Sequence, residues 1–280
     1  MKELKNKCKK IIEFFSREEL AILPGHLAYY FLISIIPTIM LILYFALSLS
    51  LSSDAIIDII VSTVPDNIFN LIEPYINATP INVFSTITLL TTLFIASNGA
   101  RSIIVASNTV FHIKPKKQYM KYFKSFVITF IIIILFIFLL FVPIFGEIIL
   151  NIFNKLGVKS ELLFAFNLLY PIVKWPLTFL FIFSMVKIIY IIAPDRLVKG
   201  SNVDRGSLVT TCAWMVITFI YSRYVTMITT SGRYNLYYGG LATVVLLIFW
   251  FYLMAYAFVV GLLLNYDKIS KKSEEELTSD

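Results

Sequence analysis

Long apolar segments separated by short charged ones run through the whole chain. Six of them hold the roughly 18 or more mostly apolar residues that a membrane-spanning helix needs. They cover about residues 25–52, 81–112, 126–150, 168–193, 206–229 and 238–265. The pattern predicts an all-α fold, a polytopic membrane protein with six transmembrane helices. We expect the transmembrane domain to occupy residues 26–267, with a cytoplasmic tail at 268–280.

Two further segments are amphipathic rather than uniformly apolar. Residues 1–25 mix Lys and Arg with Ile, Phe and Leu, which is typical of a helix along the cytoplasmic membrane surface. An ordinary cytoplasmic helix leading into the first span is the alternative. Residues 53–80 carry four acidic residues, no Lys or Arg, and three prolines that interrupt any helix. We therefore expect an N-terminal amphipathic helix and an interfacial segment on the outer face.

The composition agrees with a membrane protein. Hydrophobic residues make up 59% of the 280-residue chain and charged residues 15%, against about 25% charged in soluble domains. The spans use up the length, so no soluble catalytic domain is expected.

A net charge of +7 raises the question of nucleic acid, but the positions of the charges suggest another origin. Seventeen of the 24 Lys and Arg residues lie in segments 1–25, 114–124, 194–205 and 268–280. Basic residues collect in the cytoplasmic loops of membrane proteins. We therefore predict a cytoplasmic-membrane protein with both termini inside the cell, and no nucleic-acid partner.

The second span carries polar residues along one side. At about 100° per residue, Asn98, Arg101 and Asn108 fall on one broad face. An Arg in the middle of a span must face protein, water or a ligand, because lipid does not solvate it. We expect the other spans to pack around this helix. The fifth span has a polar side of its own, which includes Thr218 and is expected to face neighbouring helices.

Two interpretations of the polar residues remain open. In the first, Asn98, Arg101, Asn108 and Thr218 line a cavity that binds or translocates an anionic or lipid-like substrate. Arg101 then attracts an anionic head group or a small anion. In the second, the Arg is structural and binds carbonyls freed by Pro37 or Pro143, and the chain is a structural or interaction protein of the cell envelope. The spans hold no Asp or Glu well inside them, which disfavours proton-relay transport.

The residues do not favour an enzyme, and we expect no catalytic residue, metal or cofactor. The two Cys and two His are too far apart for a metal-binding motif, and Ser34, His26 and His112 lack a nucleophile–base spacing. Metal-assisted phosphodiester hydrolysis needs clustered carboxylates, and the cytoplasmic acids show no Asp-x-Asp grouping. The expected partners are membrane lipids, and a homo-oligomer is compatible with the sequence.

Two stretches near the ends of the chain carry a family resemblance. The first is the segment His26-Leu-Ala-Tyr-Tyr-Phe-Leu-Ile-Ser-Ile-Ile-Pro37, and the second is the series Gly206, Trp214, Tyr224, Tyr237-Tyr238-Gly239-Gly240-Leu241, Trp250 and Gly261. They resemble the YihY/BrkB family, historically labelled ribonuclease BN. Asn108 and Pro194-Asp195 match two further positions, although the family has Pro-Asn at the latter. The family usually has Gly-Ala-Glu where this chain has Gly261-Leu262-Leu263, so the acid is missing at Leu263. The resemblance implies an integral membrane protein without a settled activity.

Overall fold

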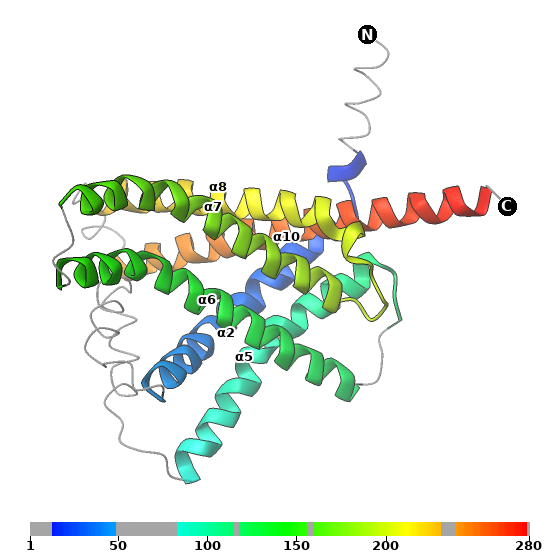
Figure 1. The fold of residues 1–280 in the computed structure, drawn as a ribbon. Coiled ribbons are helices and arrows are strands. Elements are labelled where there is room, and N and C mark those ends of the chain that lie inside the picture. Colours follow the sequence, from blue (N-terminus) through cyan, green and yellow to red (C-terminus); the bar gives the residue numbers. More distant parts are fainter. Residues whose placement is uncertain (1–12, 49–82, 115–117, 156–159, 231–238, 279–280) are drawn as a thin grey trace.

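The computed structural model describes residues 13–48, 83–114, 118–155, 160–230 and 239–278. Six long helices make up almost all of this part of the chain, and it contains no strand (Figure 1). They are α2 (Glu18–Ser48), α5 (Val83–Val110), α6 (Gln118–Lys155), α7 (Ser160–Ile192), α8 (Gly200–Thr230) and α10 (Gly239–Thr278). Each contains a stretch long and apolar enough to cross a membrane. The predicted all-α, six-span membrane protein is confirmed.

Two of the predicted features fall largely outside the described residues. The interfacial segment expected at 53–80 does so completely, and the amphipathic N-terminal segment does so for residues 1–12. The rest of the latter leads into the first span, because α2 already begins at Glu18. Glu18 and Glu19 in its first turn interact favourably with the helix dipole. At the other end of the chain α10 continues through Thr278, and in Figure 1 it extends past the other helices.

The helices form a closed ring in chain order. Each packs against the next, α2 on α5, α5 on α6, α6 on α7, α7 on α8 and α8 on α10, and α10 returns to α2. The candidate span in α5 has the largest buried share of the six, 44%. As expected, α5 is the most buried of the six candidate spans. It is not surrounded by the other five helices, however, because it is one member of the ring.

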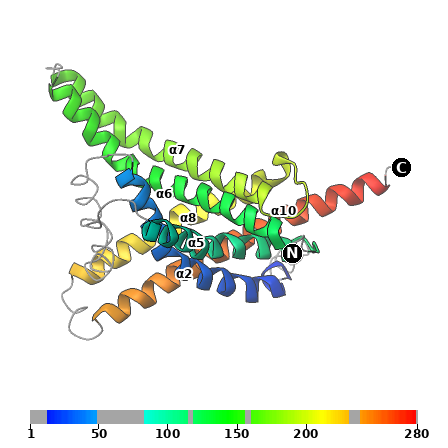
Figure 2. The same ribbon diagram turned by 90° about the horizontal axis from the view of Figure 1, so that it is seen from below.

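Among the described residues, the larger of two buried hydrophobic clusters lies at one end of the bundle, which we call the basic end because it carries Arg17, Lys124, Arg196 and Lys268. The main hydrophobic core is built there from the first halves of α2 and α6 and the second halves of α5, α7 and α10. Towards the opposite end, α6 and α7 stay together and diverge from α8 and α10 (Figure 2). The aromatic rings of Phe138 and Phe181 stack between α6 and α7, with centroids 3.5 Å apart.

Contacts between distant segments hold the basic end together. Arg17 makes a two-pronged ion pair with Asp267, with both N–O distances 2.9 Å. Lys268 donates to the carbonyl of Ser201. The guanidinium of Arg196 lies over the ring of Phe111, 5.3 Å from its centroid. The start of α2, the end of α5, the α7–α8 connection and the end of α10 therefore meet at one end.

Glycines allow α8 and α10 to cross closely. A Cβ atom at Gly206 would collide with the carbonyl of Gly261 and with the amide of Asn265, and one at Gly261 would collide with the hydroxyls of Thr210 and Tyr190. Without side chains the backbones come within reach of polar partners. Gly206 N donates to Asn265 Oδ1 at 2.9 Å. Close approach through small residues is a common way for membrane helices to associate.

Tyr190 connects α7 to this crossing. Its hydroxyl donates to the carbonyl of Phe258 at 2.8 Å and accepts from Thr210 Oγ1 at 2.7 Å. The phenol has one proton to give, and Thr210 Oγ1 has a second acceptor in the carbonyl of Ala257 at 3.3 Å. On the next turns of α8, Trp214 Nε1 donates to the carbonyl of Met254 at 2.9 Å. Three helices are thus joined by buried hydrogen bonds.

Candidate functional site

A cavity of about 260 Å³ lies between α2 and α5. Its lining comes from two helix faces and consists of His26, Tyr30, Asn98, Arg101, Ser102 and Val105. The α5 residues are spaced by three, one and three positions, which places them on one stripe of a helix, and the α2 residues are four apart. We call this space the Arg101 cavity. Asn98 and Arg101, two of the four predicted site residues, share it.

Arg101 lies against two aromatic rings, and two of its nitrogens have no hydrogen-bond partner among the described residues. Its guanidinium carbon is 4.2 Å from the centroid of Tyr122 and 5.5 Å from that of Phe94. The two rings stack on each other at 5.8 Å. The Nε and Nη2 atoms are buried and have no hydrogen-bond partner among the described residues. The alternative in which freed carbonyls bind this Arg is therefore not observed for these two atoms.

His26 brings a further unpartnered atom to the cavity. Its Nδ1 is buried and has no hydrogen-bond partner among the described residues, and its ring lies 4.9 Å from that of Tyr30. His26 and Arg101 thus both line the cavity, and each has buried nitrogen atoms without a partner among the described residues. Unsatisfied buried polar atoms are rare in folded proteins and need a specific explanation.

The position of α2 against α5 depends on Gly99. A Cβ atom at Gly99 would lie 2.9 Å from Ser34 Oγ, closer than such atoms approach in real structures. The missing side chain lets the two helices approach directly beside Asn98 and two residues before Arg101. This approach places His26 and Tyr30 opposite the α5 stripe.

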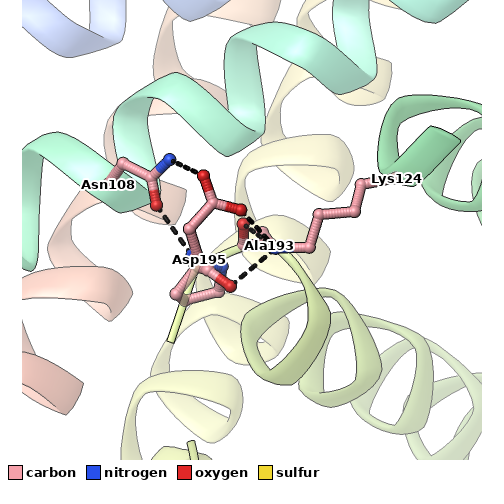
Figure 3. Close-up of polar contacts among 5 residues, drawn as sticks. Asn108, Lys124, Ala193 and Asp195 are labelled. Carbon is pink, nitrogen blue, oxygen red and sulfur yellow. Dashed lines mark hydrogen bonds and ion pairs between the residues drawn. The ribbon is translucent and has the colours of Figure 1, made fainter. Parts of the chain in front are cut away.

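Asn108, the third predicted site residue, belongs to a different polar cluster (Figure 3). Its Nδ2 donates to Asp195 Oδ2 and its Oδ1 accepts from the backbone N–H of Asp195, both at 2.8 Å. Lys124 Nζ donates to Asp195 Oδ1 at 2.7 Å and to the carbonyls of Pro194 and Ala193 at 2.8 and 3.3 Å. The Asp195 side chain is fully buried. This Lys124–Asp195 cluster joins α5 and α6 to the segment after α7.

The end of α5 turns directly beside this cluster. Ile113 N donates to the carbonyl of Asn108 at 2.9 Å and His112 N to that of Thr109 at 3.1 Å. His112 has φ of 52°. These are the two hydrogen bonds of a Schellman cap, with the left-handed position occupied by a residue other than the usual glycine. Asn108 therefore contributes its carbonyl to the helix end and its side chain to Asp195.

Thr218, the fourth predicted site residue, lies on α8. It lines a groove of about 330 Å³ between α8 and α10, together with Tyr221, Ser222, Val225, Thr226, Leu247 and Trp250. The structure thus places the four predicted residues in three locations. Sequence reasoning missed His26 and Tyr30 as cavity residues, although both lie in the stretch that carries the family resemblance.

The described part of the chain shows no candidate metal site. No group of three or more His, Cys, Asp or Glu side chains is placed there to hold a metal ion. Asp195, the buried acid in the Pro194-Asp195 motif, already accepts hydrogen bonds from Asn108 and Lys124.

Comparison with known proteins identifies the family. The family model described as virulence factor BrkB matches residues 11–279. The chain belongs to the BrkB family. The ribonuclease-like protein YfkH of Bacillus subtilis (strain 168) is 25% identical over 244 residues, which cover 85% of this chain and 86% of that protein. No solved structure gives a significant match.

Several residues that carry the BrkB resemblance now have structural positions. Gly206, Gly261 and Trp214 build the α8–α10 crossing. Asp195 is the centre of the Lys124–Asp195 cluster. Leu263, where the resemblance leads us to expect a glutamate, is buried in the hydrophobic core. These positions serve close helix packing and hydrogen bonds between helices. Among the described residues, buried polar atoms without a hydrogen-bond partner occur both at this crossing, at Asn265 Nδ2, and in the Arg101 cavity.

Proposed function

We propose that this BrkB family protein binds an anionic, lipid-like substrate at the Arg101 cavity and moves it across the membrane. The observation that carries the proposal is a guanidinium inside a candidate span with two buried nitrogens for which the described residues supply no acceptor. Leaving such donors unsatisfied is costly in a low-dielectric interior. An anion that binds there removes this cost and gains the attraction of the charge.

The position of the cavity supports a membrane substrate. It lies between two membrane-spanning helices, and its lining combines the cation with an amide, a phenol, an imidazole and a hydroxyl. Ionisable residues inside spans commonly mark the path of a substrate or ion.

The competing proposal is a structural or interaction protein of the cell envelope. One observation favours it: the rings of Tyr122 and Phe94 attract the Arg101 guanidinium, and such contacts are worth about 0.5–2 kcal/mol. Arg101 would then join α5 to α6 without binding a ligand.

We propose that the basic end faces the cytoplasm, in the cytoplasmic membrane. Four basic segments that lie far apart in the sequence meet at this end, linked by contacts of Arg17, Lys124, Arg196 and Lys268. The excess of Lys and Arg on the cytoplasmic side of membrane proteins gives the direction. In a chain with Cys8 and Cys212 replaced by serine, the variant Leu197→Cys should react with an impermeant maleimide only from the cytoplasmic side of the membrane, because the side chain at position 197 is exposed.

Translocation is tested in liposomes that contain phosphatidylcholine and fluorescent phosphatidylglycerol. Wild type, Arg101→Leu and Arg223→Leu are compared at equal reconstitution, with the loss of fluorescence after adding dithionite as the measure. Arg223 is the control, because it is exposed on α8 and stacks on Phe219. We expect wild type and Arg223→Leu to move the lipid and Arg101→Leu to lose this activity. Equal rates in all three samples and in empty liposomes would contradict the proposal and favour the structural alternative.

A further inference from the structure

The two unpartnered nitrogens of Arg101 lie on the same edge of the guanidinium. By the naming convention for arginine, Nη1 lies on the same side of the Nε–Cζ bond as Cδ. Nη2 therefore lies on the same side as the hydrogen on Nε. The Nε–H and one Nη2–H bond are therefore nearly parallel. A parallel pair of donors fits two oxygens attached to one carbon or phosphorus atom, which is the geometry of two-pronged recognition of carboxylate and phosphate. A monatomic anion has no second acceptor to offer.

The charge balance of the cavity limits the ligand further. Of the six lining residues, Arg101 carries the permanent charge, and none of the described lining residues is a carboxylate. One negative charge on the ligand therefore neutralises the site. A doubly charged anion would leave one negative charge without a permanent cation among the cavity residues, which disfavours it against a singly charged anion.

The aromatic rings favour a guanidinium over an ammonium in this position. Tyr122 lies against the guanidinium at 4.2 Å and stacks in turn on Phe94. A planar guanidinium can stack on rings and still present its edge donors, whereas the ammonium of a lysine cannot do both. Contacts with the two rings thus limit the directions in which the guanidinium can point its donors.

We propose that the Arg101 cavity takes a singly charged oxyanion with two oxygens on one atom, the phosphodiester of a phospholipid or a carboxylate. This inference rests on the proposed function, because it assumes that the cavity binds a ligand. Nε and Nη2 are buried, so the ligand reaches them after a lining side chain moves. His26 and Tyr30 on α2 line the same cavity as Arg101.

The test measures ligand binding to the full chain in detergent by titration calorimetry. Dioctanoyl phosphatidylglycerol supplies a singly charged phosphodiester, dioctanoyl phosphatidic acid a phosphomonoester, octanoate a carboxylate and sodium chloride a monatomic anion. We expect saturable binding of phosphatidylglycerol or octanoate, weaker binding of phosphatidic acid in spite of its larger charge, and no competition by equimolar chloride. The phosphatidylglycerol and octanoate titrations separate the two sources of the oxyanion.

The variant that tests the two-pronged contact is Arg101→Lys, with Arg223→Lys as the matched control on α8. Loss of one charge-assisted hydrogen bond should weaken binding about tenfold in Arg101→Lys, and Arg223→Lys should bind as wild type does. Equal binding by Arg101→Lys and wild type, or displacement by equimolar chloride, would overturn the inference. The comparison of ligands on wild type needs no variant and holds if Arg101→Lys fails to fold.

Binding and translocation give separate answers. Saturable binding of the expected anions without translocation supports the ligand class and contradicts the transport half of the proposed function. Translocation that proceeds with equal binding of chloride and phosphatidylglycerol supports transport and contradicts the ligand class. If wild type binds none of the four probes, both are overturned.

Discussion

Two cations on neighbouring helices, Lys124 on α6 and Arg101 on α5, have opposite surroundings. Lys124 Nζ has three oxygen acceptors within hydrogen-bond distance, among them the fully buried carboxylate of Asp195. Arg101 has rings on its face and no acceptor at Nε or Nη2 among the described residues. The difference suggests that Lys124 stabilises the fold and that Arg101 is available to bind a ligand. The predictions below test this contrast through its effects on stability and access.

The largest loss of stability is expected from Asp195→Ala. The substitution leaves Lys124 without its carboxylate and Asn108 without its acceptor, and breaking a buried pair in this way costs about 3 kcal/mol or more. Equilibrium unfolding in mixed micelles measures the change. The matched control is Asp204→Ala, because Asp204 pairs with Lys187 at 2.6 Å at a partly exposed site, where such pairs contribute about 0–1 kcal/mol. Equal losses in the two variants would contradict a special role of the Lys124–Asp195 cluster.

A smaller loss is expected at the second tightly packed region, the α8–α10 crossing. In Gly261→Ala the new methyl group meets the hydroxyls of Thr210 and Tyr190, so the helices must separate and strain their hydrogen bonds. Overpacking of this kind costs about 1–3 kcal/mol. Gly25→Ala is the control, since a Cβ atom there has nothing within 4 Å and alanine favours a helix. The melting temperature should fall in the first variant and stay or rise in the second.

Arg101→Leu should change stability least of these buried-site substitutions. It removes a cation–π contact of about 0.5–2 kcal/mol, and it also removes two buried donors without acceptors, which is a gain. We expect the free energy of unfolding to change by less than about 1 kcal/mol while anion binding is lost. A loss as large as that of Asp195→Ala would show that Arg101 is structural and would remove the contrast with Lys124.

The parts of the structure that could be predicted from the sequence depend on local geometry. Span lengths follow from bilayer thickness, so six helices could be located from apolar runs alone. Asn98 and Arg101 lie three positions apart on one helix, and they share the cavity for that reason.

The rest of the site depends on contacts between distant segments. Asn108 finds its partner Asp195 87 positions away, and Thr218 faces α10. The contributions of His26 and Tyr30 depend on the approach of α2 to α5 at Gly99. No local periodicity contains this information, because it arises only when the helices pack.

The smallest effect that tests the contrast between Arg101 and Lys124 is the access of a thiol reagent to the Arg101 cavity. This measurement does not depend on a change in the free energy of unfolding. In a chain with Cys8 and Cys212 replaced by serine, cysteine at Asn98 should react with an aqueous thiol reagent, because Asn98 is partly exposed and lines the cavity. Cysteine at Ala106, which is fully buried on the same helix, should not react. Addition of dioctanoyl phosphatidylglycerol should slow the reaction at position 98, since a bound ligand fills the space beside it. A reaction at 98 that the lipid leaves unchanged would mean that water enters the cavity but this anion does not, and the available charge of Arg101 would then have to serve a different ligand.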